Sequence, residues 1–164
     1  MAPIRKKVCI AGAPGVGKTS LLQTFVYGAP DSGAQGLLVA HRLIERPGTD
    51  GIDLAIWDEP GGESLDANVK KLYRGAAGIL LVCDLTRPET VSALVYHIPA
   101  LRSAYPDAVL AFAGNKADSP ECRVPEVDVT ALGHAYDAPA LLTSAITGQG
   151  VDALFEALAV RMVE

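Results

Sequence analysis

The sequence predicts an α/β protein in which helices cover both faces of a mostly parallel sheet. Three observations predict this class. Runs rich in β-forming residues alternate with segments of helical spacing along the whole chain. Two of the runs, at 76–85 and 108–115, are almost continuously apolar, as expected for strands buried on both faces. A glycine-rich turn follows the first run, and ligands of parallel sheets bind at the carboxyl ends of the strands.

The first half of the chain begins with a strand at 6–12, which runs into the glycine-rich turn and a helix at 18–28. Two further β-type runs, at 37–45 and 52–57, are joined by the segment RPGTDG. Its proline and glycines indicate a turn, so we expect these two strands to form an antiparallel hairpin. Residues 64–73 suit a short helix.

The second half repeats the alternation, with strands at 76–85, 108–115 and 139–146 and helices at 88–101, 124–136 and 151–162. Pro88 is well placed to open a helix, because a proline in the first turn removes no hydrogen bond. Pro99 lies within the same apolar pattern. A proline inside a helix favours a kink or an earlier end, and the sequence leaves both open.

Size and composition indicate one soluble domain over residues 1–164. Hydrophobic residues make up 49% of the chain and charged residues 20%, as in ordinary globular proteins. No stretch is long and apolar enough to span a membrane, and we expect no intrinsic lipid anchor. Cys9, Cys83 and Cys122 are an odd set, which favours free thiols in the reducing cytoplasm.

The charge pattern argues against nucleic acid as a partner. The net charge is −5, and the longest run of lysine and arginine covers just residues 5–7. Binding to a phosphate backbone depends on a broad basic surface, which this composition does not provide.

The segment GAPGVGKT, which begins at Gly12, matches the phosphate-loop pattern G-x-x-x-x-G-K-[ST]. It lies between a predicted strand and a predicted helix, as this motif requires. Gly12, Gly15 and Gly17 let the backbone curl so that its N–H groups surround phosphate oxygens. Lys18 supplies a positive charge to the β- and γ-phosphates, and Thr19 offers a hydroxyl to Mg²⁺.

A second motif, NKAD, follows the strand at 108–115 and selects the base. The Asp118 carboxylate accepts two hydrogen bonds from the N1–H and 2-amino groups of guanine, whereas adenine has no such donor pair. Asn115 is placed to tie loops together, and the Lys116 stem to lie over the base. In the later segment TSAI, the N–H of Ala145 is placed to donate to the guanine O6.

Together these motifs resemble a Ras-superfamily small GTPase, in the style of its Rab and Ras-like branches. The resemblance rests on GAPGVGKTSLL, IWDEPGGE, LYRGAAGILLVCDLT, GNKAD and TSAI, which follow the family order at near-family spacing. They cover essentially the whole chain. The resemblance implies the P-loop NTPase three-layer sandwich, with a six-stranded, mostly parallel sheet, one antiparallel strand and five helices.

The resemblance also implies the ligands, GTP or GDP with Mg²⁺, and the roles of site residues. Lys18 and Gly61 would serve the γ-phosphate. Thr19 would bind Mg²⁺ directly and Asp58 through water. Regulators or effectors would contact residues 28–46 and 59–73. Nucleotide contacts are expected at Gly12, Ala13, Pro14, Gly15, Val16, Gly17, Lys18, Thr19, Ser20, Asn115, Lys116, Asp118, Ser144, Ala145 and Ile146.

The sequence departs from the family pattern where hydrolysis is controlled. The family glutamine that orients the attacking water falls on Gly62, which has no side chain. A partner acting in trans could place that water, and cis candidates are Glu63, Glu59 and Gln35. The family threonine of the first switch is also missing, because residues 25–48 contain no threonine.

The position of the missing threonine can be located by counting, and two further positions differ. Gln35 or Gly36 falls at the missing threonine, and Ser32 is a nearby hydroxyl. Where an aromatic residue covers the base edge in the family, this chain has Pro30, with Tyr27 and Phe25 close by. Pro14 contributes no N–H to the phosphate loop and would crowd an approach to the γ-phosphate.

Two functions therefore remain open. One is a GTPase switch that is slow or depends on a partner, and the other is a guanine-nucleotide-binding scaffold without useful turnover. An ATP-using P-loop enzyme conflicts with NKAD and the Ser-Ala turn. Arg42 and Arg46 lie on the predicted hairpin, either as effector contacts or as ordinary solvated arginines.

Overall fold

The computed structural model describes residues 2–30, 39–58 and 73–164. A six-stranded sheet has the order β2-β3-β1-β4-β5-β6. Its elements are β1 (Ile4–Gly12), α1 (Lys18–Tyr27), β2 (Val39–Ile44), β3 (Ile52–Trp57), β4 (Gly78–Asp84), α3 (Glu89–Ala104), β5 (Val109–Asn115), α4 (Glu126–Tyr136), β6 (Ala140–Leu142) and α5 (Val151–Val163). The four helices belong to the described residues, and the short helix expected at 64–73 falls almost entirely outside them.

One strand runs antiparallel to the others, as the hairpin prediction required. β2 pairs antiparallel with β3, from Val39 opposite Trp57 to Ile44 opposite Ile52, whereas β1, β3, β4, β5 and β6 are mutually parallel. Gly51 ends the turn with a φ of +85°, and a Cβ there would stand 2.6 Å from the Ile44 carbonyl oxygen. The turn therefore depends on glycine at this position.

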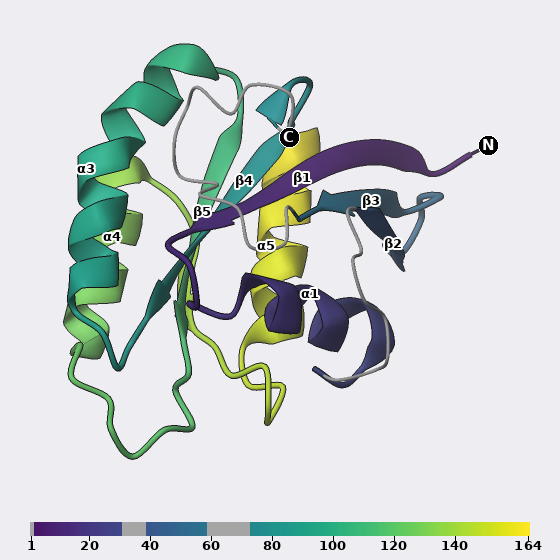
Figure 1. Ribbon diagram of the computed structural model, residues 1–164. Helices are drawn as coiled ribbons and strands as arrows, with labels where there is room; N and C mark the ends of the chain where they lie inside the picture. The colour runs from purple at the N-terminus through teal and green to yellow at the C-terminus, as the bar shows by residue number, and fades with distance from the viewer. Residues whose placement is uncertain (1, 31–38, 59–72) are drawn as a thin grey trace.

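The helices form two outer layers, which confirms the predicted three-layer sandwich. Figure 1 shows α1 and α5 on one side of the sheet and α3 and α4 on the other. Residues alternate between the two cores along the first strand: Val8 and Ile10 pack on the α1/α5 side, and Cys9 and Ala11 on the α3/α4 side. Each large buried apolar side chain contributes roughly 1.5–3 kcal/mol to folding.

Helix α3 continues through Pro99 and ends five residues later, so the earlier end that the proline suggested is wrong. Pro99 lies on the exposed side of the helix, whereas Ile98 and Leu101 are buried in the core beneath it. Packing of these two side chains favours a continued helix and offsets the hydrogen bond that proline removes.

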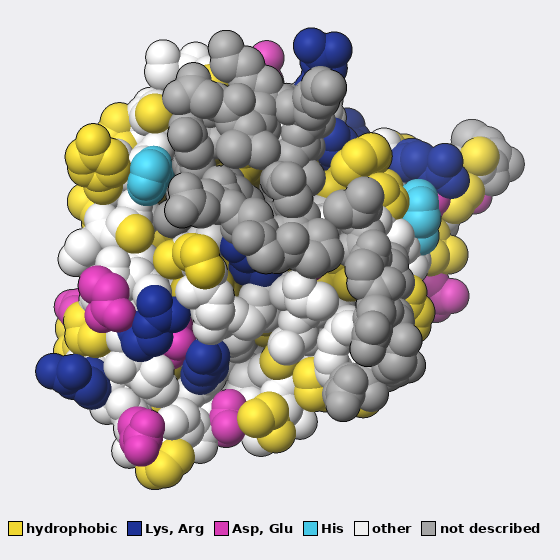
Figure 2. Space-filling view, in the orientation of Figure 1, with side chains coloured by type: hydrophobic (Ala, Val, Ile, Leu, Met, Phe, Trp, Pro, Cys, Tyr) yellow, Lys and Arg dark blue, Asp and Glu magenta, His cyan; other side chains and the backbone are white. Residues whose placement is uncertain are grey.

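The last strand is shorter than predicted, because only Ala140–Leu142 pair with β5. The residues from Thr143 onward leave the sheet and form the loop that leads to α5. No described helix is long and apolar enough to cross a membrane. In the described surface of Figure 2, lysine and arginine side chains are interspersed with aspartate and glutamate.

None of the three cysteines forms a disulfide, as expected. Cys9 and Cys83 are buried in β1 and β4, and burial raises the pKa of each thiol to about 12. These two thiols therefore remain protonated at neutral pH and behave as small core residues. Cys122 is exposed in the loop that follows β5.

Candidate functional site

The candidate site lies at the carboxyl end of the parallel sheet, where two adjoining hollows meet. One has a volume of about 390 Å³ and is lined by Pro14, Gly15, Gly17, Lys18, Thr19, Ser20 and Lys116. The other has a volume of about 350 Å³ and is lined by Gly17, Ser20, Asn115, Lys116, Asp118, Ser119, Pro120, Ala145 and Ile146. They share Gly17, Ser20 and Lys116, so the phosphate-loop and NKAD motifs border one continuous surface.

Each glycine of the phosphate loop has its own structural reason. A Cβ on Gly12 would stand 2.6 Å from the carbonyl oxygen of Val82 in the neighbouring strand. Gly15 and Gly17 have φ angles of +81° and +100°, which favour glycine. A Cβ on Gly17 would also lie 2.4 Å from Nδ2 of Asn115. The loop can therefore approach both the sheet and the base-reading segment closely.

Helix α1 begins at Lys18, so its amino-terminal turn borders the loop. A helix amino terminus carries unsatisfied N–H groups and a partial positive charge that attract phosphate. The Lys18 side chain is buried, at 7% exposure, and its Nζ donates to the Gly12 carbonyl at 2.7 Å. The ammonium group therefore lies within the curl of the loop.

Thr19 and Asp58 come together from α1 and the end of β3. Thr19 Oγ1 donates to Asp58 Oδ2 at 2.6 Å, and Asp58 is fully buried. A hydroxyl and a carboxylate are hard oxygen ligands, which fit Mg²⁺. The described residues hold no cluster of three or more His, Cys, Asp or Glu side chains suited to a metal. Mg²⁺ characteristically takes few protein ligands and completes its shell with water and phosphate oxygens.

Asn115 joins the phosphate loop to two other loops. Its Nδ2 donates to the Val16 carbonyl at 2.9 Å, and its Oδ1 accepts from Thr143 Oγ1 at 3.1 Å. The side chain is 2% exposed, so both hydrogen bonds are shielded from water. This is the loop-tying geometry that the sequence predicted for Asn115. Lys116, the next residue, has a φ of +68° and its Nζ reaches the Gly15 carbonyl at 3.0 Å.

Asp118 lies at the edge of the second hollow and is held by the loop after β6. Its Oδ1 accepts a hydrogen bond from Ser144 Oγ at 2.7 Å, and Ser144 is fully buried. The neighbouring Ala145 carbonyl accepts from Thr24 Oγ1 of α1 at 2.6 Å, which fixes this loop against the helix. Ile146 is 73% exposed and supplies an apolar wall to the hollow.

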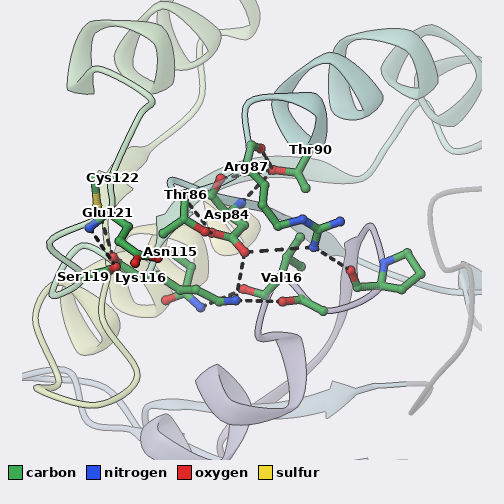
Figure 3. Close-up of polar contacts among 12 residues, drawn as sticks. Val16, Asp84, Thr86, Arg87, Thr90, Asn115, Lys116, Ser119, Glu121 and Cys122 are labelled. Carbon is green, nitrogen blue, oxygen red and sulfur yellow. Dashed lines mark hydrogen bonds and ion pairs between the residues drawn. The ribbon is translucent and has the colours of Figure 1, made fainter.

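Two side chains near this end of the sheet were missed by sequence reasoning. Asp84, at the end of β4, is fully buried and its Oδ2 lies 2.8 Å from Lys116 Nζ. Arg87, in the turn before α3, donates through Nη1 to the Pro14 carbonyl at 3.0 Å. Figure 3 shows both beside Lys116 and Asn115. An aspartate closing an apolar strand next to this motif was the available signal for Asp84.

The aromatic residues considered as covers for the base, and the arginine considered as an effector contact, differ in burial and in partners. Phe25 is buried and stacks on Phe155 of α5, with ring centroids 4.0 Å apart, so it belongs to the core. Tyr27 is 48% exposed. Arg42 donates to the Phe25 carbonyl at 2.6 Å and to Asp152 at 2.8 Å. Arg42 thus joins β2 to α1 and α5.

The residues that respond to the γ-phosphate in the sequence interpretation lie outside the described part of the chain. They are Ser32, Gln35, Gly36, Glu59, Gly61, Gly62 and Glu63. Their roles stay predictions, and so do the partner contacts expected over 28–46 and 59–73.

Comparison with known proteins agrees with this geometry. Residues 7–164 match the Ras family. The chain is 32% identical to human Ras-related protein Rab-4B over 154 residues, which is 91% of this chain and 72% of that protein. It is 34% identical to Ras-related protein RABC2a of Arabidopsis thaliana over 163 residues, covering 96% and 78% of the two chains. Bovine Rab-26 is 34% identical over 159 residues, 93% of this chain and 62% of that one. This chain is therefore a member of the Ras family and is Rab-like.

Proposed function

We propose that this protein is a guanine-nucleotide switch of one domain that binds GTP and GDP with Mg²⁺ and hydrolyses GTP slowly or with help from a partner. Membership of the Ras family supports the general function of a GTP-binding switch. The observation that carries the proposal is the Asn115 side chain, which bonds the phosphate loop at Val16 and the loop after β6 at Thr143. One ligand can therefore contact all three segments.

Selection of guanine is assigned to Asp118. Its carboxylate borders the second hollow and one oxygen is already held by Ser144, which fixes its orientation. Guanine offers two donors to a carboxylate, and adenine would leave it without a matching donor pair. Ala145, Lys116 and Ile146 line the same hollow. The backbone N–H of Ala145 is proposed to donate to the guanine O6, and the Lys116 stem and Ile146 are proposed to contact the base.

The phosphates are assigned to the glycine loop, the start of α1 and Lys18. Loop N–H groups and the Lys18 ammonium stabilise negative charge on the phosphates, which is the main route to catalysis in phosphoryl transfer. Mg²⁺, when bound, neutralises charge that develops on the phosphate oxygens. Thr19 and Asp58 are the residues proposed to hold it, directly and through water. Gly61 is proposed to meet the γ-phosphate through its N–H.

Slow or assisted turnover is proposed because Gly62 carries no side chain to orient the attacking water. The second candidate, a scaffold that binds guanine nucleotide without useful turnover, is favoured by the same glycine and by the absence of threonine from residues 25–48. Retention of Lys18, Thr19 and Asp58 at one site favours the switch. The three thiols fit a cytoplasmic location, and regulators or effectors are proposed to contact 28–46 and 59–73.

Single-turnover GTP hydrolysis with Mg²⁺ tests the proposal, measured with the protein alone and with added cell lysate. We expect slow phosphate release alone and faster release with lysate, and no release from a Lys18→Ala variant. A lysate-only sample subtracts background hydrolysis. Absence of phosphate release in both conditions contradicts the switch and leaves the scaffold. Preference for ATP over GTP in a competition assay contradicts both.

A further inference from the structure

Three successive carbonyl groups of the phosphate loop each receive a side-chain donor from a neighbouring loop. Arg87 Nη1 donates to Pro14 at 3.0 Å, Lys116 Nζ to Gly15 at 3.0 Å, and Asn115 Nδ2 to Val16 at 2.9 Å. A peptide group directs its N–H opposite to its C=O. Fixing the carbonyls on the outer side of the loop therefore fixes the direction in which the following N–H groups point.

Pro14 makes the orientation of the remaining N–H groups of the phosphate loop more important. Proline has no N–H, so this loop has one donor fewer than a loop with another residue at the same position. The N–H that follows the Pro14 carbonyl belongs to Gly15, whose φ of +81° leaves the backbone free to turn. The Arg87 guanidinium restrains that peptide group. A Cβ on Gly15 would lie 3.3 Å from Arg87 Nη1, which shows how closely the arginine packs on the loop.

A buried carboxylate lies between the two cations of this group. Asp84 is fully buried, with Oδ2 at 2.8 Å from Lys116 Nζ and 4.0 Å from Arg87 Nη1. Its other oxygen accepts hydrogen bonds from the Thr86 N–H at 2.8 Å and the Thr86 hydroxyl at 2.6 Å. The carboxylate position is thus fixed from both sides. Figure 3 shows the dashed contacts that join Asp84, Arg87 and Lys116.

The backbone around Asp84 is equally restrained. The Asp84 N–H donates to Thr90 Oγ1 at 2.9 Å, and the Thr90 hydroxyl donates to the Arg87 carbonyl at 2.7 Å. The Arg87 N–H donates to the Asp84 carbonyl at 2.9 Å. The turn before α3 therefore presents the arginine toward the phosphate loop from a closed network of hydrogen bonds, which includes Thr90 of the first helical turn.

We propose that Asp84 and Arg87 are positioning residues for the nucleotide: Asp84 orients the Arg87 and Lys116 side chains, and Arg87 holds the Pro14–Gly15 peptide so that the loop stays arranged around the phosphates. This inference rests on the proposed guanine-nucleotide binding. Its consequence is a longer residence time of the bound nucleotide, because a preorganised loop loses less conformational freedom on binding.

The test measures release of a fluorescent, ribose-labelled GDP from the full chain after mixing with excess unlabelled GDP and Mg²⁺. Arg87→Ala removes the charged hydrogen bond to the Pro14 carbonyl, together with the exposed contact with Glu89, and should speed release about fivefold. Arg87→Lys keeps a cationic donor and should restore release to within about twofold of the wild-type rate. Asp84→Asn affects both cations and should speed release more than about tenfold.

Two comparisons separate positioning from a general loss of stability. Arg102→Ala is the matched control, because Arg102 also bonds a backbone carbonyl, that of Ala108 at 3.0 Å, but near the opposite end of α3. We expect its release rate to equal the wild-type rate. The second comparison is the ratio of GDP to GMP affinity. Arg87→Ala should lower this ratio, because the phosphate loop contacts the β-phosphate that GMP lacks, whereas general destabilisation weakens both ligands alike.

Coupling between the two residues is read from the double variant. If Asp84 acts partly through Arg87, the fold-increase in GDP release rate of the double variant falls below the product of the fold-increases of the two single variants. A factor equal to the product overturns that role for Asp84. Arg87→Ala release equal to that of Arg102→Ala, or equal losses for GDP and GMP, overturns the role of Arg87. A wild-type chain that binds no GDP overturns both this inference and the proposed function.

Discussion

At the scale of single residues, the candidate site depends on polar side chains buried at the ends of strands. Asp58, Asp84 and Asn115 end or directly follow β3, β4 and β5, and each is at most 2% exposed. Burying such groups costs free energy unless hydrogen bonds replace water. Each has a partner on another segment, Thr19 of α1 for Asp58, Lys116 for Asp84 and Val16 for Asn115, so satisfying these groups also fixes the segments to one another. Stability and ligand geometry are therefore linked here.

Asp118→Asn should change which base the protein prefers. An amide offers one donor and one acceptor, so it no longer matches the two donors of guanine but can donate to the 2-oxo group of xanthine. We expect GDP affinity to fall at least about 100-fold and xanthosine diphosphate to bind better than GDP. Competition against labelled nucleotide measures both affinities.

The matched control for the base experiment is Asp128→Asn, which makes the same chemical change on the exposed surface of α4. It should leave both affinities at wild-type values. Equal loss of both nucleotides in Asp118→Asn, with no gain for xanthosine diphosphate, would show that Asp118 does not contact the base.

Thr19→Ala should remove most of the dependence of nucleotide release on Mg²⁺. The Thr19 hydroxyl and the Asp58 carboxylate lie 2.6 Å apart and are the proposed protein contribution to the metal. In the wild-type chain, chelation with EDTA should speed GDP release at least about tenfold, because the metal bridges protein and phosphate.

In the Thr19→Ala variant, release should be fast before EDTA is added and change little afterwards. Thr130→Ala is the control, because that hydroxyl donates to the Val127 carbonyl within α4 at 3.2 Å and Thr130 does not line either hollow. An unchanged response to EDTA in Thr19→Ala would contradict the metal role.

At the scale of elements, the sequence predicted the type and order of every described helix and strand, and the differences lie at their ends. The strand expected at 139–146 ends at Leu142, because the Thr143 carbonyl accepts from the Ala117 N–H at 3.0 Å and the Ser144 N–H donates to the Gln149 carbonyl at 2.9 Å, so the chain turns into the site. Local patterns carry no signal for such long-range bonds. The positions of Asp84 and Arg87 were missed for the same reason, since their partners lie on distant loops.

Pro99→Ala should stabilise the protein without changing nucleotide binding. Pro99 is exposed inside α3, where alanine restores a helical N–H donor and favours the helix. The unfolded chain gains freedom when proline is lost, which offsets part of the gain. We expect the free energy of unfolding to rise by about 1–2 kcal/mol, measured by urea denaturation.

Pro106→Ala provides the comparison for this helix prediction, because Pro106 lies in the loop between α3 and β5. It should leave the free energy of unfolding unchanged or lower it slightly. A less stable Pro99→Ala variant would show that the proline ring itself contributes to packing.

At the scale of the whole molecule, two hydrophobic cores stabilise the fold, and one polar edge of the sheet forms the candidate site. The α1/α5 and α3/α4 cores cover the two faces of the sheet, and the polar edge brings together Asp58 at the end of β3 and the loops that follow β1, β4, β5 and β6. Alternation of apolar runs was sufficient to predict the layers, because it reflects burial directly. The phosphate-loop and NKAD motifs predicted the site because each residue type has a specific chemical task.

Acid stability should report on the buried carboxylate that joins these loops. Burial by itself raises the pKa of the Asp84 carboxyl. The hydrogen bond and positive charge of Lys116 and two hydrogen bonds from Thr86 together lower this pKa by more than burial raises it, so the pKa in the folded protein lies below the usual value. A group with a lowered folded pKa stabilises the protein above its unfolded pKa of about 3.9, and this stabilisation is lost as pH falls through the folded value.

The stability difference between wild-type protein and Asp84→Asn should therefore be constant from pH 7 to about pH 5 and shrink below about pH 4. Urea denaturation at each pH measures this difference, and effects of the other carboxyls cancel because both chains share them. Glu89→Gln is the control, since Glu89 bonds Arg87 from the exposed side at 3.2 Å and should show a small difference at every pH. A wild-type advantage over Asp84→Asn that grows on acidification would mean that Asp84 is protonated in the folded protein, which contradicts its pairing with Lys116.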